Sequence, residues 1–209
     1  MSRNYFSILG SVLLILTCTG CGEDEPPRGA AALKQACDGV LDSAMIKEAS
    51  RSEDFDRIYD ASNSEDSHAS AAKTLLMEDR VAYVCEVAIE DAPPSGDKAL
   101  YIKYTPGQPR LFPEEDKHSY SSYKAYDLGP GMQATIEAGR GDVRFPCNIK
   151  DRDSVSVTGT IYNDLDLSRE TRFRILFRSS LKMAKLLKCG NEIKFPASET
   201  MKPLPMAEN

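Results

Sequence analysis

The chain has 209 residues, of which 41% are hydrophobic and 28% are charged, and its net charge at pH 7 is −6. This composition is typical of a globular protein and excludes collagen-like, wholly disordered and polytopic membrane classes. The negative net charge gives no electrostatic reason to expect a nucleic acid as a partner. Six cysteines are many for a protein of the reducing cytosol. Composition therefore says more about the cellular compartment of the protein than about its activity.

Residues 1–20 have the order of a secretory signal peptide. Arg3 precedes an apolar run from Tyr5 to Leu16. This run is too short for a membrane-spanning helix, which needs about 20 apolar residues. Four small residues then lead up to Cys21: Thr17, Cys18, Thr19 and Gly20. The order of charged, apolar and small segments predicts export from the cytoplasm.

The end of this segment resembles the signal of bacterial lipoproteins. In that family a small residue precedes a cysteine that receives a diacylglycerol thioether before cleavage, and Gly20-Cys21 fits this pattern. Cys18 departs from it, because a leucine usually stands at that position. The resemblance implies a lipid on Cys21 that anchors the protein to the outer side of the cell membrane. Ordinary secretion after cleavage near Gly20 is the alternative. The tether and cysteine layout also look like those of small uncharacterised lipoproteins of actinobacteria. This resemblance implies no particular activity.

Residues 21–29 are predicted to form a flexible tether. The sequence after Cys21 is GEDEPPRG, which is acidic, contains Pro26-Pro27 and has no large apolar side chain that packs on a core. A globular domain is expected over residues 30–196. A frayed tail is expected over residues 197–209.

The cysteine count agrees with export and lipidation. Five cysteines remain after removal of residues 1–20, and a lipid on Cys21 leaves an even set for two disulfides. Four cysteines allow three connectivities. They lie tens of residues apart without a close pair such as CxxC, so a zinc site is not expected, and no other cofactor is predicted. The four predicted disulfide cysteines are Cys37, Cys85, Cys147 and Cys189.

Apolar periodicity predicts both helices and strands. Helices are expected over residues 30–49, over 68–78, and from an N-cap at Ser168 to a stop at Gly190. Strands are expected over residues 55–61, 81–90, 99–104, 123–128, 132–138, 142–149, 154–162 and 192–195. The second and third of these strands are expected to pair as a hairpin. The fold class is therefore α+β, with antiparallel strands packed by two or three amphipathic helices and two disulfides.

Two stretches of the domain have a similar organisation. In residues 30–105 and again in 131–196, a cysteine precedes a helix and a second cysteine lies beside a strand, at similar separations. This suggests two related halves, each closed by its own disulfide: Cys37–Cys85 and Cys147–Cys189. In the chain-entropy model each bridge would stabilise the fold by about 4 kcal/mol.

Candidate catalytic groups are few. The two histidines, His68 and His118, are expected on the surface, and no G-x-S-x-G motif accompanies them. Arg140-Gly141-Asp142 is expected to be a turn between strands. The tyrosines of the central loop are expected to lean on the core: Tyr120, Tyr123 and Tyr126. Four carboxylates flank the strand 154–162 and are expected to be turn and capping residues: Asp151, Asp153, Asp164 and Asp166. That strand spans about 30 Å, so one ion cannot bridge both ends.

The predicted last helix reverses the acidic sign of the chain. Between residues 169 and 188 it carries seven cations: Arg169, Arg172, Arg174, Arg178, Lys182, Lys185 and Lys188. Such a face suits an anionic envelope polymer or lipid headgroups. The alternative is a solvated face whose cations complement the helix dipole.

These observations predict an extracytoplasmic, membrane-anchored lipoprotein, secreted if Cys21 is not lipidated. A non-enzymatic binding or envelope-interaction module of unknown ligand is the predicted function. The alternative is a cell-envelope hydrolase that acts on wall polymer or peptide, for which the carboxylates around residues 151–166 are the best support. A third possibility is a purely structural role in assembly.

Overall fold

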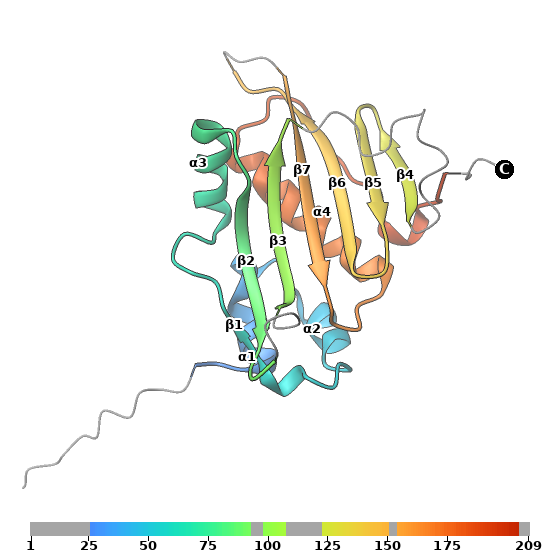
Figure 1. Cartoon of the computed structure of the whole chain (residues 1–209). Helices are drawn as coiled ribbons and strands as arrows, with labels where there is room; N and C mark the ends of the chain where they lie inside the picture. The colour runs from blue at the N-terminus through green and yellow to red at the C-terminus, as the bar shows by residue number, and fades with distance from the viewer. Residues whose placement is uncertain (1–25, 93–97, 108–122, 151–153, 205–209) are drawn as a thin grey trace, which may run out of the picture.

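The computed structural model describes residues 26–92, 98–107, 123–150 and 154–204 (Figure 1). Within these ranges the chain forms a seven-stranded antiparallel sheet and four α-helices, which confirms the predicted α+β class. The predicted signal segment and the lipidation site Cys21 lie outside the described residues. No helix in the described ranges has the length and apolar character needed to cross a membrane.

The sheet has the strand order β1-β2-β3-β7-β6-β5-β4. Its strands are β1 (Ile58–Asp60), β2 (Ala82–Ile89), β3 (Lys98–Pro106), β4 (Lys124–Gly129), β5 (Met132–Ile136), β6 (Arg140–Cys147) and β7 (Val155–Asn163). β2 and β3 pair as the predicted hairpin, and β4 to β7 form a meander. The two parts meet where β3 pairs with β7, with Tyr101 opposite Tyr162 and Tyr104 opposite Gly159. The predicted halves thus contribute to one continuous sheet.

The helices lie on one face of this sheet (Figure 1). They are α1 (Gly29–Gln35), α2 (Ser43–Ala49), α3 (His68–Glu78) and α4 (Arg169–Leu186). The core fills the space between the two layers. Ile102 of β3 and Ile161 of β7 are fully buried, as are Phe173 and Leu176 of α4. Each such side chain contributes about 1.5–3 kcal/mol by leaving water.

The predicted single helix over residues 30–49 is wrong. A short 3₁₀ segment, η1 (Ala36–Gly39), separates α1 from α2, and Cys37 and Asp38 within it are left-handed, with φ of 56° and 55°. Two consecutive left-handed residues cannot continue a right-handed helix. The apolar spacing runs through this break, because Val40 and Leu41 are still buried beyond it. Periodicity alone therefore could not reveal the break.

Both predicted disulfide pairings are confirmed. Cys37 bonds Cys85, which ties η1 to β2. Cys147 bonds Cys189, which ties the end of β6 to the chain just after α4. Each bridge therefore joins the helical layer to the sheet.

The chain enters the domain at Arg28. The Arg28 guanidinium donates a hydrogen bond of 2.8 Å to Glu90 Oε1, and Arg28 forms an isolated antiparallel bridge with Tyr59 of β1. Gly29 follows with φ of +53°, where a Cβ would lie 3.3 Å from the Phe55 carbonyl oxygen. Both the left-handed backbone and this close approach favour glycine at the start of α1.

The final strand predicted over residues 192–195 is absent. These residues lack strand pairing, and the Phe195 ring instead stacks on Phe177 of α4 at a centroid distance of 4.5 Å. Beyond it, Met201 is buried and the Leu204 amide donates to the Ala125 carbonyl at 2.8 Å. In residues 192–195, the Phe195 side chain thus packs on α4 while the backbone pairs with no strand.

Gly159 makes room for a buried tyrosine. A Cβ at Gly159 would lie 2.7 Å from Tyr104 Cε1 and 3.2 Å from Ser180 Oγ, and Tyr104 is fully enclosed. The Tyr104 ring therefore crosses β7 where that strand has no side chain.

Gly159→Ala should lower the free energy of unfolding by about 1–3 kcal/mol, because the added methyl overpacks the core against Tyr104. Chemical denaturation measures this loss. Gly139→Ala is the matched control, since its Cβ would meet ordinary contacts of 3.6 Å and longer. Equal stability of the two variants would contradict the assigned role of Gly159.

Candidate functional site

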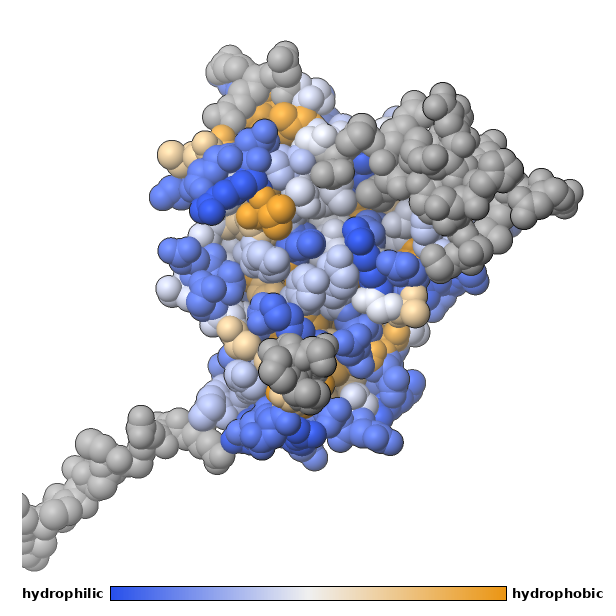
Figure 2. Space-filling view, in the orientation of Figure 1, coloured by the Kyte–Doolittle hydropathy of each residue, from blue (hydrophilic) through white to orange (hydrophobic). Residues whose placement is uncertain are grey.

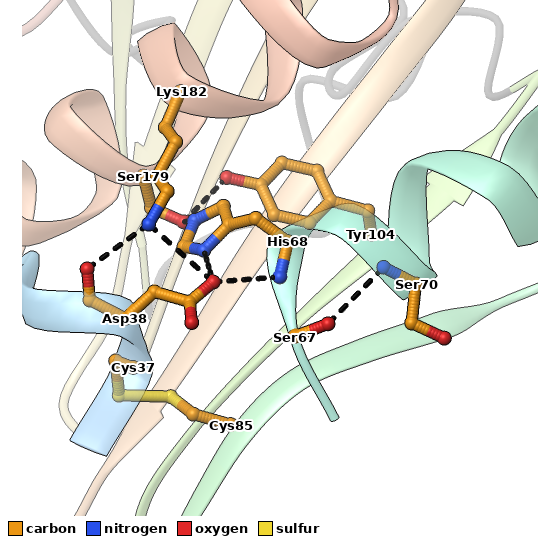
Figure 3. A network of polar contacts seen from close by, with 9 residues as sticks. All are labelled: Cys37, Asp38, Ser67, His68, Ser70, Cys85, Tyr104, Ser179 and Lys182. Atoms are coloured by element: carbon orange, nitrogen blue, oxygen red, sulfur yellow. Dashed lines mark hydrogen bonds and ion pairs between the residues drawn. A yellow bond between two sulfur atoms is a disulfide. The ribbon is translucent and has the colours of Figure 1, made fainter. Parts of the chain in front are cut away.

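His68 is the centre of a buried polar network (Figure 3). It is the first residue of α3, and its side chain is fully buried, so the expected surface position is wrong. His68 Nδ1 lies 2.9 Å from Asp38 Oδ2, and His68 Nε2 lies 2.8 Å from Ser179 Oγ. The Tyr104 hydroxyl lies 2.8 Å from the same Ser179 oxygen. Four elements, η1, α3, β3 and α4, supply these groups.

The hydrogen bonds of this network have one consistent assignment of donors and acceptors. An ionised Asp38 only accepts, so His68 Nδ1 carries the proton and Nε2 is the acceptor for the Ser179 hydroxyl. Ser179 then accepts from the Tyr104 hydroxyl, which lies 3.2 Å from Ser180 Oγ. Each of these side chains thereby obtains a partner, as buried polar groups require.

Asp38, His68 and Ser179 have the connectivity of a hydrolytic triad. Ser179 nevertheless lies in the middle of α4, and both it and His68 are completely enclosed. Its hydroxyl is already engaged by Tyr104 as well as by His68. No substrate carbonyl can reach an oxygen buried in this way, so the network stabilises the packing of α3 and α4 instead of supplying a nucleophile.

The network holds both its titrating groups away from their ordinary pKa. Burial lowers the pKa of His68 below 6.5, and the neighbouring Lys182 lowers it further, while Asp38 opposes the shift. Burial raises the pKa of Asp38, but hydrogen bonds from the His68 amide and ring, with Lys182, outweigh it and hold that pKa below 3.8. The folded protein therefore keeps a neutral imidazole beside an ionised carboxylate.

Most cations of the predicted basic helix pair with carboxylates or carbonyl groups of the same molecule. Arg178 binds Asp42 at 2.7 Å, Arg174 lies 3.7 Å from the same carboxylate, and Lys182 lies 3.4 Å from Asp38. Arg169 pairs with Glu170, and the buried Arg172 donates to the carbonyls of Glu137 and Ala138, at 2.7 Å each. Within the described ranges, Lys185 and Lys188 make no ion pair. Lys185 in the last turn of α4 and Lys188 just beyond the end of the helix are therefore the two cations available to an anionic partner.

The other face of the sheet, which the described helices leave uncovered, carries a row of tyrosines and cations. Figure 2 shows this face as largely hydrophilic. Tyr101 of β3 and Tyr162 of β7 stack at a centroid distance of 4.4 Å, and Tyr83 of β2 lies 6.1 Å from Tyr101. We call this set, together with Lys98, Lys103 and Arg140, the tyrosine row. Its members come from four adjacent strands, β2, β3, β7 and β6.

The cations of the tyrosine row lie over its rings. Lys98 Nζ is 5.5 Å from the Tyr101 centroid, and Lys103 Nζ is 5.3 Å from that of Tyr162. The Arg140 guanidinium is also 5.3 Å from the Tyr162 centroid. Burial and the adjacent Tyr162 raise the pKa of Tyr101 to about 12, so its hydroxyl stays protonated and able to donate. The row therefore displays hydrogen-bond donors and positive charge.

Polar side chains continue along β7 beside the row. Asp142 of β6 accepts from Arg140 at 2.9 Å and 3.0 Å, and from Thr160 at 2.6 Å. Thr158 is 4% exposed, and its Oγ1 has no hydrogen-bond partner. Strand alternation places Thr158 and Thr160 on the same face as Tyr162.

The other sequence candidates are separated from this face or from one another. Arg140-Gly141-Asp142 begins strand β6, so the expected turn is wrong. Tyr126 is fully buried against Phe173, as expected for a residue that leans on the core. Asp164 and Asp166 are exposed, and no group of acidic, histidine and cysteine side chains in the described residues is suited to a metal ion. Outside the described residues lie His118, Tyr120, Asp151 and Asp153.

An apolar hollow of about 270 Å³ lies where α3 approaches the ends of β3 and β7. It is lined by Leu75, Leu76, Met77, Asp79, Pro106, Ile149, Val155, Val157 and Leu187. It is smaller than the usual small-molecule pocket, and Asp79 is its single charged lining residue.

No family model, curated protein or solved structure matches this chain. Its function is therefore inferred from its own side chains. Among the described groups, the tyrosine row combines surface access with concentrated binding chemistry, whereas the His68 network is enclosed. Sequence inspection missed the row, because Tyr83, Tyr101 and Tyr162 come together only through the register of β2, β3 and β7.

The His68 network predicts a pH-dependent stability. Because the folded pKa lies below 6.5, the unfolded chain binds the extra proton, so stability is complete above pH 6.5 and decreases as the pH falls below it. His68→Gln should therefore lose most of the difference in unfolding free energy between pH 7.5 and pH 5.5. Denaturant titrations at the two pH values measure it.

Ser179→Ala is the control for this prediction. It removes the hydrogen bonds of the Ser179 hydroxyl to His68 Nε2 and to the Tyr104 hydroxyl and lowers stability by about 1–3 kcal/mol at both pH values, but it keeps the imidazole and hence the pH dependence. An unchanged pH dependence in His68→Gln would contradict the buried, neutral histidine.

Proposed function

We propose that the protein is a non-enzymatic binding module, anchored to the outer side of the cell membrane by a lipid on Cys21, and that the open face of its sheet is the binding surface. The tyrosine row is the observation that carries this proposal. It places three rings and three cations on the sheet face that no described helix covers.

Three observations support the location. The two disulfides, Cys37–Cys85 and Cys147–Cys189, are compatible with an oxidising compartment outside the cytoplasm. They also use four of the five cysteines that follow residue 20, which leaves Cys21 for the lipid. In the lipoprotein-like sequence Gly20-Cys21, that cysteine stands at the position that receives the lipid in bacterial lipoproteins.

A binding role fits the two polar clusters better than catalysis does. In the cluster with triad-like connectivity, His68 and Ser179 are completely buried, so Ser179 has no access to a substrate. The accessible cluster contains tyrosines and permanent cations instead of a nucleophile beside a general base. Its groups suit recognition, because aromatic side chains and arginine are enriched in binding surfaces.

The mass of the protein isolated from the membrane fraction tests the anchor. We expect residues 21–209 with a diacylglyceryl adduct, and a gain of four hydrogens on reduction of the two bridges. Cys21→Ser should remove the adduct and retain residues 1–20. A lipid-free mature protein recovered from the medium would overturn the anchoring but leave the binding surface to be tested.

A charge reversal tests the binding surface. Lys103→Glu should reduce the binding of the purified mature protein to washed cell envelopes at least fivefold, measured by co-sedimentation, because it reverses a cation in the tyrosine row. Lys185→Glu is the matched control, since it makes the same change on α4. Loss of binding in Lys185→Glu with none in Lys103→Glu would move the surface to the basic helix.

A further inference from the structure

We infer that the tyrosine row binds an acidic polysaccharide, laid across the strands of the open face. This inference rests on the proposed binding function and names its ligand class. The row has the two features that such a chain requires: positive charge for its carboxylates and a dense set of hydroxyl and amine donors for its oxygens.

The way in which the rings pack defines the surface that a ligand meets. Tyr101 and Tyr162 stack with an interplanar angle of 18°, so their facing ring surfaces cover each other. Lys98, Lys103 and Arg140 lie over these two rings and use more of the ring surface. The edges and hydroxyl groups are what remains for hydrogen bonds. Tyr83 is tilted by 48° to Tyr101 and is 42% exposed, so it offers a ring face at the outer end of the row.

The charges of the face are mixed. Lys98 pairs with Glu86 at 2.8 Å, and Arg140 pairs with Asp142 at 2.9 Å. Lys103 has no carboxylate partner in the described part of the chain, and its ammonium group lies over the Tyr162 ring. A surface on which cations alternate with acceptors favours a ligand that carries both anions and hydroxyl donors, as an acidic sugar chain does.

The hydroxyl group of Thr158, beside the row, lacks a hydrogen-bond partner. Its side chain is more than nine-tenths buried, and its Oγ1 has no partner, although a buried hydroxyl normally has one. On the open face it precedes Thr160 and Tyr162 along β7, and in the sheet it lies opposite Thr105 and Arg144. Because this oxygen is enclosed, it lies beneath the surface of the row, and a ligand meets the exposed groups around it.

The shape and polarity of the row favour a linear chain over a membrane surface. The row crosses four strands, which at about 4.8 Å between neighbours gives a length of about 14 Å. Surfaces that enter a bilayer combine basic side chains with exposed apolar ones. Among the described large hydrophobic side chains that are exposed, Tyr83 alone belongs to the row, and its hydroxyl is polar.

Isothermal titration of the mature protein with polygalacturonate tests the inference. We expect saturable binding that weakens at least tenfold when the carboxylates of the polymer are methyl-esterified. Lys103→Glu and Tyr83→Ala should each weaken binding at least fivefold, whereas Lys185→Glu should leave it unchanged. Raising the NaCl concentration from 0.05 to 0.5 M should also weaken it, because salt screens exposed charges.

Three outcomes would overturn the inference, and a fourth would overturn the proposed surface. Equal binding of the esterified polymer would overturn the role of charge. Co-sedimentation with phosphatidylglycerol vesicles that depends on Lys103, without binding to polygalacturonate, would identify a lipid surface in its place. If envelope binding depends on Lys103 but neither probe binds, the ligand class is wrong and the proposed function stands. If envelope binding does not depend on Lys103, the proposed surface itself fails.

Discussion

The pairing of β3 with β7 determines the chemistry on both faces of the sheet. On the open face it sets Tyr101 beside Tyr162, and on the covered face it sets Tyr104 over Gly159, where no side chain blocks the ring. Because side chains alternate along a strand, a shift of one residue would exchange the two faces and lose both arrangements. The tyrosine row and the buried network are therefore two outcomes of one register.

The helical layer is positioned by polar contacts as well as by apolar burial. Asp38 follows the disulfide cysteine Cys37 and receives hydrogen bonds from the amide and the ring of His68, while Lys182 of α4 donates to the Asp38 carbonyl at 3.0 Å. Asp42 then caps α2 and pairs with Arg178. The left-handed break at η1 thus turns carboxylates toward the basic helix, which explains why most of its cations point to partners within the molecule.

The local pattern of apolar and capping residues predicted most helices and strands well, but it could not predict contacts between residues far apart in the sequence. The helix over residues 68–78 has its predicted bounds, because Ser67 caps it and its apolar residues repeat at helical spacing. The burial of His68 was missed because Asp38 and Ser179 are 30 and 111 residues away in sequence. The tyrosine row was missed for the same reason: the alternation of each strand predicts an outward residue but does not show which residues of other strands lie beside it.

The entry of the chain at Arg28 has a mechanical consequence. A force applied to the N-terminal end acts first on the Arg28–Glu90 pair and on the bridge to Tyr59, which belongs to an edge strand of the sheet. If these contacts open, the chain extends only as far as Cys37, roughly 30 Å of straightened backbone. The disulfide then transfers the load to Cys85 in β2, which is held between two neighbours. The sheet and α4 would thus stay folded under a pull that had already unravelled α1.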